Sequence, residues 1–357
     1  MFICNYNFKI MIAIYRRSGM KAVVVDSEYG SVNAQELAQV ARAFDQAGIE
    51  LEICHFNTEE EIIDGCGDAM AILGTGNPPV TRKVMEALPQ LQFVQRFGVG
   101  VNSIDLEAAA ELGKIILNIP GFCAKELADL SAAMILGLVR NSNYYDREIR
   151  KGNWPKCQYL LPGDVREMTL GIYGFGAAGR YLHDIFHGGF GTKIISCDPY
   201  IPDDAKKQYP HVDFVDFETM VRESDIVSIH VGLSDETYHV FNKDTFKKMK
   251  NTAMIINTSR GPIIDQKDLA WALEAGEILY AGLDTVEKEP IEKDDPLLNM
   301  DNVILNPHSG SYGAGAKKTQ IETVCRLIPS AVVKGIVPKR NIANKGVLSR
   351  DTGYTYV

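Results

Sequence analysis

The sequence lacks the features of secreted, membrane and zinc-finger proteins. Its seven cysteines are scattered, odd in number and never arranged as CxxC, which argues against a disulfide framework and against zinc fingers. No apolar run reaches the roughly 18 residues that span a bilayer. The chain also has fewer positive than negative side chains. It contains 37 Lys and Arg and 46 Asp and Glu, which gives a net charge of −9. We therefore expect neither nucleic acid nor membrane as a partner.

What is present is the composition of a folded protein with about two domains. The chain has 357 residues, of which 46% are hydrophobic and 23% charged. Its first 15 residues are moderately apolar, but they lack the basic start and the cleavage site of a signal peptide. We expect a cytoplasmic protein in which residues 1–19 are an extension outside the fold.

Short β-branched or apolar runs alternate with helical stretches, in two series. This alternation predicts βαβ units and parallel sheets, an α/β fold. The six strands of the second series predict a doubly wound sheet. The predicted strands are 21–26, 49–54, 69–73, 91–96 and 115–118, then 169–173, 193–198, 226–230, 253–257, 278–284 and 303–306. The helices predicted in the first series are 33–47, 59–64, 80–88 and 105–112.

The stretch 124–151 joins the two series and is apolar at helical spacing. We predict one long helix there, which could bridge two lobes; the alternative is two helices broken near Asn141. A final helix is predicted over 316–334, and the polar residues 346–357 are expected to be a loose tail.

A glycine-rich hexad follows the first strand of the second series. A GxGxxG sequence alone is weak evidence, but this one follows an apolar strand, opens a helix and is followed by Asp198 at the end of the next strand. An ordinary glycine-rich turn is the alternative. The carboxylate of Asp198 suits the ribose 2′-OH of NAD and repels the 2′-phosphate of NADP, so we predict NAD as the cofactor. The hexad is Gly174, Phe175, Gly176, Ala177, Ala178 and Gly179.

Arg260, Glu289 and His308 stand just past the carboxyl ends of three successive predicted strands. Ligands bind at that edge of an open parallel sheet. An arginine fork binds a carboxylate, a histidine exchanges a proton near neutral pH, and a carboxylate beside it fixes its tautomer. Each residue alone could be a surface or loop residue, but together they meet the requirements of hydride transfer between a 2-hydroxy acid and a nicotinamide.

Two other patterns receive weaker interpretations. Gly98-Val99-Gly100 lacks a third glycine, so we reserve it for substrate rather than nucleotide. His183 and His187 are four apart on a predicted helix, a spacing of metal ligands. No third ligand is evident in the sequence, so we expect no metal.

Several ordered motifs resemble those of the D-isomer-specific 2-hydroxyacid dehydrogenases. The resemblance covers about residues 21–345 and includes the hexad with Asp198. The other motifs are RFGVGVNSID at 96–105, HVGLSDET at 230–237, NTSRG at 257–261, GLD at 282–284 followed by Glu289-Pro290, and NPHSG at 306–310.

The resemblance implies an NAD-dependent D-2-hydroxyacid dehydrogenase with two Rossmann-like domains, and a homodimer. A flavodoxin-like substrate domain would comprise residues 20–120 and 309–345. A doubly wound parallel-sheet domain over 121–308 would bind NAD. The partner is then a small 2-keto or 2-hydroxy acid.

The resemblance also implies roles for individual residues. Arg260 would bind the substrate carboxylate and carbonyl, His308 would be the acid/base, and Glu289 would support it. Asp284 would hold the nicotinamide carboxamide. The cofactor set is the hexad with Asp198, Pro199, His230, Val231, Gly232, Thr237, Thr258, Ser259, Arg260, Asp284, His308 and Gly310. The substrate set is Gly74, Thr75, Val99, Gly100, Arg260 and His308, in which the backbone amides of Val99 and Gly100 would meet the carboxylate.

One departure from the family pattern leaves the substrate open. Many relatives, phosphoglycerate dehydrogenases among them, have an arginine where this chain reads Gly74-Thr75, so a natural anion contact is missing. Pyruvate-like, glyoxylate-like and branched keto acids remain possible. The alternatives are a D-3-phosphoglycerate dehydrogenase, or an NAD(H)-sensing regulatory protein similar to the C-terminal binding protein corepressors.

Overall fold

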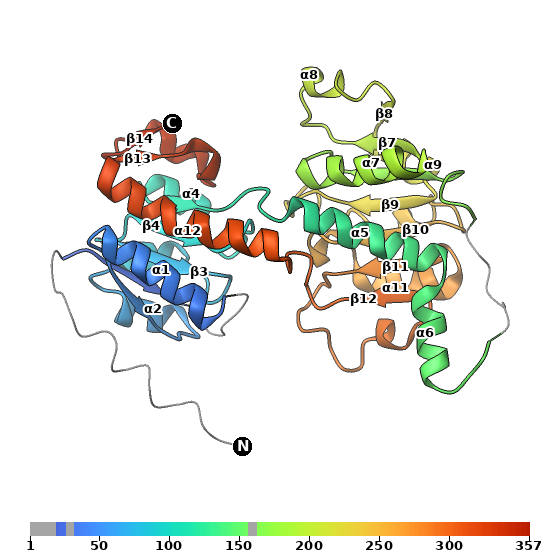
Figure 1. Cartoon of the computed structure of the whole chain (residues 1–357), viewed down its shortest axis with the longest axis horizontal. Coiled ribbons are helices and arrows are strands. Elements are labelled where there is room, and N and C mark those ends of the chain that lie inside the picture. Colours follow the sequence, from blue (N-terminus) through green and yellow to red (C-terminus); the bar gives the residue numbers. More distant parts are fainter. Residues whose placement is uncertain (1–18, 26–31, 156–162) are drawn as a thin grey trace. The chain divides into compact units, whose positions relative to one another are not determined.

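The chain folds into two compact units (Figure 1). The computed structural model describes residues 19–25, 32–155 and 163–357, so the expected extension over 1–19 lies outside the described residues except for its last position. Unit 1 comprises Met1–Phe122 and Lys318–Val357, and unit 2 comprises Cys123–Lys317. In the described ranges, no helix has the length and apolar character needed to cross a bilayer.

Unit 1 is built on a five-stranded parallel sheet with the flavodoxin-like order β2-β1-β3-β4-β5. Its central strand, Ala71–Gly74, is buried on both faces, which is why it reads as a continuous apolar run. The strands are β1 (Lys21–Val24), β2 (Glu50–Ile53), β3 (Ala71–Gly74), β4 (Phe93–Arg96) and β5 (Ile115–Leu117). The helices between them are α1 (Ala34–Gln46), α2 (Glu59–Gly65), α3 (Arg82–Ala87) and α4 (Leu106–Glu111).

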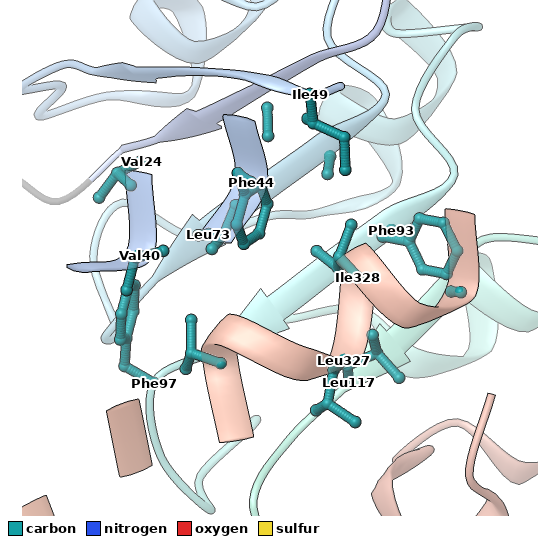
Figure 2. Packing of buried hydrophobic residues seen from close by; sticks show 14 of the residues in the cluster. Val24, Val40, Phe44, Ile49, Leu73, Phe93, Phe97, Leu117, Leu327 and Ile328 are labelled. Atoms are coloured by element: carbon teal, nitrogen blue, oxygen red, sulfur yellow. The ribbon is translucent and has the colours of Figure 1, made fainter. Parts of the chain in front are cut away.

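The last long helix, α12 (Ala314–Lys334), completes the core of unit 1. Figure 2 shows Leu327 and Ile328 of this helix beside Phe93 and Leu117 of the sheet. Side chains of α1 belong to the same cluster. Burying each large apolar side chain contributes about 1.5–3 kcal/mol, so the helix from the far end of the chain is part of what holds this sheet.

Unit 2 is built on a seven-stranded parallel sheet with the order β12-β11-β10-β9-β6-β7-β8. Strands run outward in both directions from β6, which is the doubly wound arrangement. The α/β fold expected from the alternation is confirmed. The strands are β6 (Thr169–Tyr173), β7 (Lys193–Cys197), β8 (Val212–Phe214), β9 (Ile226–Ile229), β10 (Met254–Asn257), β11 (Tyr280–Leu283) and β12 (Val303–Leu305).

Helices of unit 2 connect these strands and cover the sheet. Helices and sheet together form two hydrophobic clusters, one on each face. The long helix α5 packs beside α7, which follows the glycine-rich hexad. The helices are α5 (Ala124–Val139), α6 (Ser142–Arg150), α7 (Ala177–Phe190), α8 (Asp203–Lys206), α9 (Phe217–Glu223), α10 (Lys243–Phe246) and α11 (Gln266–Ala275). Short 3₁₀ turns are η1 (Gly261–Ile263) and η2 (Pro296–Asn299).

The single long helix predicted over 124–151 is wrong, and the alternative of two helices is what forms. Asn141 has φ of 51°, in the left-handed region, and separates α5 from α6. Asparagine tolerates that conformation better than most residues, so the helix ends there although helix formers continue beyond it. By contrast, α7 continues through Gly188 and Gly189 and ends at Phe190, with Gly191 as its left-handed C-cap.

The loose tail expected over 346–357 is also wrong. Residues Lys345–Ser349 form the 3₁₀ turn η4, and β14 (Thr355–Tyr356) pairs with β13 (Ile336–Val337). The ring of Tyr354 packs edge-on against Phe93 at 5.0 Å between centroids, and its hydroxyl donates to Gln92 Oε1 at 2.6 Å. Aromatic packing against the sheet therefore orders a segment that is polar in sequence.

The return from unit 2 to unit 1 lies later than the expected boundary at residue 309. Ser309 and Gly310 donate backbone hydrogen bonds to the Asp284 carboxylate of unit 2. The N–H of Ala316 donates to Glu126 Oε1 at 2.9 Å. These bonds keep residues 309–317 with unit 2.

Candidate active site

The glycine-rich turn between β6 and α7 leaves room for a ligand. Gly174 has φ of 95°, and a Cβ there would lie 2.8 Å from the carbonyl carbon of His230. A Cβ on Gly179 would collide with the carbonyl oxygen of Gly174. No atom lies near the corresponding position of Gly176, which precedes α7 and has no side chain to cap it. The first N–H groups of α7 are therefore directed at open space, as a pyrophosphate requires.

Asp198 follows β7 and is held beside this turn. Its carboxylate accepts the N–H of Phe175 at 2.8 Å and the N–H of Tyr200 at 2.9 Å. The Phe175 ring is fully buried beneath the turn and meets Tyr209 and Phe214 edge-on. The Asp198 carboxylate, which we expect to select NAD, is thus held in place by backbone N–H groups. The site formed by the glycine-rich turn and Asp198 fits a dinucleotide.

Three neighbouring strands bring the candidate catalytic residues to one edge of the sheet. Strands β10, β11 and β12 are adjacent and parallel. Arg260, Glu289 and His308 each follow the carboxyl end of one of them, at the edge that also carries the turn after β6 (Figure 1). The edge therefore combines a guanidinium, a carboxylate and an imidazole.

Glu289 and His308 form a hydrogen-bonded pair. Glu289 Oε2 lies 2.7 Å from His308 Nδ1, and Glu289 Oε1 accepts the N–H of Val286 at 3.3 Å. Burial acts to raise the pKa of Glu289, but the hydrogen bond and charge of His308, with smaller help from Val286 and Arg260, bring it below its usual value. Glu289 is ionised at neutral pH, so Nδ1 of His308 is the donor and Nε2 is left for a reacting group.

Arg260 is partly buried and tied to its own loop. Its Nη1 donates to the carbonyl oxygen of Ser259 at 2.7 Å, and its carbonyl oxygen accepts Asn257 Nδ2 at 2.9 Å. Burial lowers the pKa of the Arg260 guanidinium, and the negative charge of Glu289 partly offsets that effect. The side chain keeps its charge and has donors to spare for a carboxylate.

Asp284, directly after β11, positions the loop that carries His308. Its two carboxylate oxygens accept the N–H groups of Ser309 at 2.7 Å and Gly310 at 2.8 Å. The carboxylate is almost fully buried, and its main-chain oxygen accepts the N–H of His308 at 2.8 Å. His308 itself has φ of 54°. The contact between Asp284 and the loop of His308 was not predicted from the sequence. The adjacency of β11 and β12, the strands that precede these two residues, could have indicated it.

The loop after β9 contains His230 and Thr237, two other residues of the expected cofactor set. His230 Nε2 lies 2.8 Å from Ser228 Oγ, and burial lowers the pKa of His230 to about 4. His230 is therefore neutral at pH 7 and is suited to hydrogen bonding rather than to proton transfer. Thr237 Oγ1 donates to the carbonyl oxygen of Gly232 at 2.8 Å and accepts the N–H of Ser234 at 2.8 Å, which closes the loop.

The remaining members of the expected cofactor set lie at the start of α7 and in the loops after β7, β9, β10 and β12. Ser259 Oγ donates to the carbonyl oxygen of Ile229 at 3.0 Å, and Thr258 Oγ1 lies 3.0 Å from Ser131 Oγ. The others fall in four places: Ala177 and Ala178 in the first turn of α7, Pro199 after β7, Val231 and Gly232 after β9, and Gly310 after β12.

The expected substrate residues of unit 1 lie at the carboxyl ends of β3 and β4. Arg96 donates through Nε to the carbonyl oxygen of Gly100 at 3.1 Å and through Nη2 to that of Thr75, the residue after Gly74. Asn118 Nδ2 donates to the carbonyl oxygen of Val99 at 2.8 Å. Among the described residues, the hydrogen bonds of this loop use the carbonyl groups of Val99 and Gly100 and none uses their N–H groups. The amides are available to an anion.

Known proteins resemble this chain in sequence and in structure. A family model described as the NAD-binding domain of D-isomer specific 2-hydroxyacid dehydrogenases matches residues 132–310. A glyoxylate reductase of Korarchaeum cryptofilum is 35% identical over 300 residues, which cover 83% of this chain and 90% of that protein. A D-3-phosphoglycerate dehydrogenase of Methanocaldococcus jannaschii is 33% identical over 297 residues, 82% of this chain and 56% of that protein. The crystal structure of a glyoxylate reductase from Paecilomyes thermophila matches with a TM-score of 0.79 at 28% identity, over 88% of this chain and 96% of that one.

Proposed function

Because the chain belongs to the family of D-isomer specific 2-hydroxyacid dehydrogenases, we propose that Arg260, Glu289 and His308 are its catalytic residues and that its substrate is a small 2-keto acid. The family makes it an NAD-dependent oxidoreductase that interconverts 2-hydroxy and 2-keto acids, and NAD as the cofactor is confirmed. One observation carries the assignment of roles: His308 Nδ1 is paired with Glu289 at 2.7 Å, on the strand edge where Arg260 lies.

His308 acts as the general acid in reduction. Bound NADH supplies the hydride that reaches the carbonyl carbon. Protonated His308 donates its Nε2 proton to the carbonyl oxygen, and the negative charge of Glu289 stabilises the imidazolium before transfer. In the oxidative direction, neutral His308 removes the hydroxyl proton. Glu289 keeps Nδ1 protonated in both states, so the exchange is confined to Nε2.

Arg260 binds the substrate carboxylate and polarises the adjacent carbonyl, because its planar fork offers parallel donors. In unit 1, the N–H groups of Val99 and Gly100, which no hydrogen bond among the described residues uses, suit a carboxylate. Asp284 accepts the nicotinamide carboxamide through lone pairs that Ser309 and Gly310 do not use.

The substrate is a keto acid without a second charged group, with glyoxylate as the first candidate and pyruvate and branched keto acids next. The arginine at the edge formed by β3 and β4, Arg96, is buried and donates to the backbone at Thr75 and Gly100. It is therefore not free to bind a phosphate, which disfavours 3-phosphohydroxypyruvate.

A panel of keto acids, followed through NADH absorbance, tests the function. We expect turnover of glyoxylate, pyruvate or a branched keto acid and much lower kcat/KM with 3-phosphohydroxypyruvate. A clear preference for the phosphorylated acid would favour the phosphoglycerate dehydrogenase alternative. NADH binding without turnover of any member would favour the sensor resembling corepressors.

Asp198→Asn should reduce the discrimination against NADPH. The substitution keeps an acceptor for one of the two N–H groups, that of Phe175 or that of Tyr200, and removes the charge that repels a 2′-phosphate. We expect the ratio of kcat/KM for NADH to that for NADPH to fall by about tenfold or more, equivalent to about 1.4 kcal/mol. Asp204→Asn, an exposed carboxylate paired with Lys207, is the control and should leave the ratio unchanged. An unaltered ratio in Asp198→Asn would mean that another group selects the cofactor.

Glu289→Gln should shift the pH dependence of reduction. The pKa of Glu289 lies below its usual value, so in the wild type the carboxylate is charged throughout pH 5 to 9. Without that charge the imidazolium that donates the proton is less stabilised, so reduction slows and its dependence on pH changes. We expect a rate loss of about 10- to 100-fold at pH 7.5.

Glu287→Gln is the matched control for this profile. It removes a second Glu–His pair of the same loop, in which Glu287 Oε1 lies 3.0 Å from His239 Nε2. Its pH profile should overlay that of the wild type. A similar displacement in both variants would show that the loop, rather than the charge on His308, is responsible.

We propose a cytoplasmic homodimer, on the strength of the family resemblance and of free thiols. The five cysteines in the described residues are unpaired, and burial raises the pKa of Cys66 to about 12 and that of Cys123 to about 11. Thiols in this state suit a reducing compartment. Light scattering coupled to size-exclusion chromatography tests the dimer, and a monomer mass would reject it.

A further inference from the structure

Three histidines gather at one place in unit 2, away from the strand edge described above. His183 and His187 lie one turn apart on α7, and His211 immediately precedes β8. One ring nitrogen of each lies within 4.8 Å of the others. The sequence argument against a metal was the lack of a third ligand, and the fold supplies that ligand from a segment distant in sequence.

His183 already has the surroundings of a metal ligand. Its ring is 4% exposed, and Nδ1 lies 2.9 Å from Asp184 Oδ1. A carboxylate at one ring nitrogen holds the proton there and leaves the other nitrogen as a lone-pair donor, as is usual for histidines that bind metals.

Nε2 of His183 faces Nε2 of His211. The two atoms are 2.6 Å apart, so without a metal ion they share one proton in an N–H···N hydrogen bond, which a bound metal ion would replace. His187 stacks on His211 with ring centroids 3.9 Å apart and planes at 12°. Parallel rings do not aim their lone pairs at one point, so binding a metal requires the rings of His187 and His211 to turn.

That rotation is small and inexpensive. In a tetrahedral zinc site with Zn–N of about 2.0–2.1 Å, ligand nitrogens are about 3.4 Å apart. The present nitrogens, within 4.8 Å, need displacements of about 1.5 Å or less. His187 is half-buried and His211 exposed, so both are free to change rotamer while buried His183 stays in place.

We propose that His183, His187 and His211 form a binding site for a transition-metal dication, with Zn²⁺ as the expected ion and water as its fourth ligand. Three imidazole ligands favour Zn²⁺, Ni²⁺ or Cu²⁺ over Mg²⁺ or Ca²⁺, which prefer oxygen ligands. The ion ties the C-terminal half of α7 to the segment before β8. Phe175 of the nucleotide turn packs edge-on against His183 at 5.8 Å between centroids, so the site also stiffens the support of that turn.

Zinc titration of the untagged full-length protein tests the site, without NADH or keto acid, so that the result does not depend on the proposed function. We expect one equivalent of Zn²⁺ to bind at pH 7.5 and saturating Zn²⁺ to raise the Tm by about 5 °C or more. Binding should weaken strongly at pH 5.5, because the ligands must be deprotonated. Co²⁺ should give the visible absorption of a tetrahedral nitrogen site.

His187→Gln and His211→Gln each should weaken Zn²⁺ binding tenfold or more, and the double variant should lose the Tm increase and the Co²⁺ spectrum. Both positions reach solvent, so the variants should fold; the Tm without metal checks this. His55→Gln, a histidine of unit 1, is the control and should bind as the wild type does. Zn²⁺ binding that persists in the double variant, for example at His308 and Glu289, would overturn the proposal, as would the absence of a stoichiometric site in the wild type.

Discussion

Replacing His308 by alanine should lower the turnover of a 2-keto acid by about 10³-fold or more, within the range that general acid–base catalysis contributes. The variant removes the only proton donor proposed for the carbonyl oxygen. It leaves the loop after β12 in place, because Asp284 holds that loop through the N–H groups of Ser309 and Gly310 rather than through the imidazole. The affinity for NADH, measured by fluorescence titration, should therefore stay within a few-fold of the wild type.

His239→Ala is the matched control for that experiment. His239 also pairs with a glutamate of the loop after β11, but at Glu287 rather than at the proposed centre. Its kcat should be close to that of the wild type. Turnover near the wild-type value in His308→Ala would refute the role of His308, whereas loss of NADH binding together with turnover would mean that the substitution has disrupted the loop.

Arg260→Ala should lower kcat/KM for the keto acid by about 10³-fold, equivalent to about 4 kcal/mol, as expected for removal of one partner of a desolvated charged pair. The loss should appear in both KM and kcat, since the guanidinium binds the carboxylate in the ground state and polarises the carbonyl in the transition state. Steady-state kinetics with the best substrate of the panel measure both constants.

Arg260→Lys separates the charge of this residue from its geometry. Lysine restores a positive charge but not the planar fork, so we expect only partial recovery of kcat/KM. Arg222→Ala, an exposed residue of α9, controls for the loss of a positive charge elsewhere in unit 2. A KM effect alone in Arg260→Ala, with kcat unchanged, would restrict the residue to binding and remove the polarising role.

Features that follow from short-range pattern were predictable. The nucleotide turn needs three glycines at fixed spacing and an acid at the next strand end, and all lie within one βαβ unit. Arg260, Glu289 and His308 could be placed together because parallel strands end at one edge, although the residues are far apart in sequence. The structure adds the contact between Glu289 and His308, which depends on the path of a loop and has no periodicity to reveal it.

Features that depend on tertiary packing were not predictable. β8 is three residues long and too short to show a pattern, and its pairing with β7 is what makes it a strand. The break at Asn141 was one of two alternatives in the sequence, and only its left-handed backbone conformation decides between them. His211 joins His183 and His187 only because β8 completes the edge of the sheet, so a search for ligand spacing on one helix could not find it.

The discontinuity of unit 1 sets an order of events on the ribosome. Unit 2 is one uninterrupted stretch and can fold as soon as it emerges. The sheet of unit 1 is translated first, but it is complete only when α12 covers one face. It also needs the side chains of Asn341 and Asn344, which donate to the carbonyl groups of Asn118 and Lys114. The nascent chain therefore carries an uncovered apolar sheet through most of its synthesis, and the part made earliest is the part finished last.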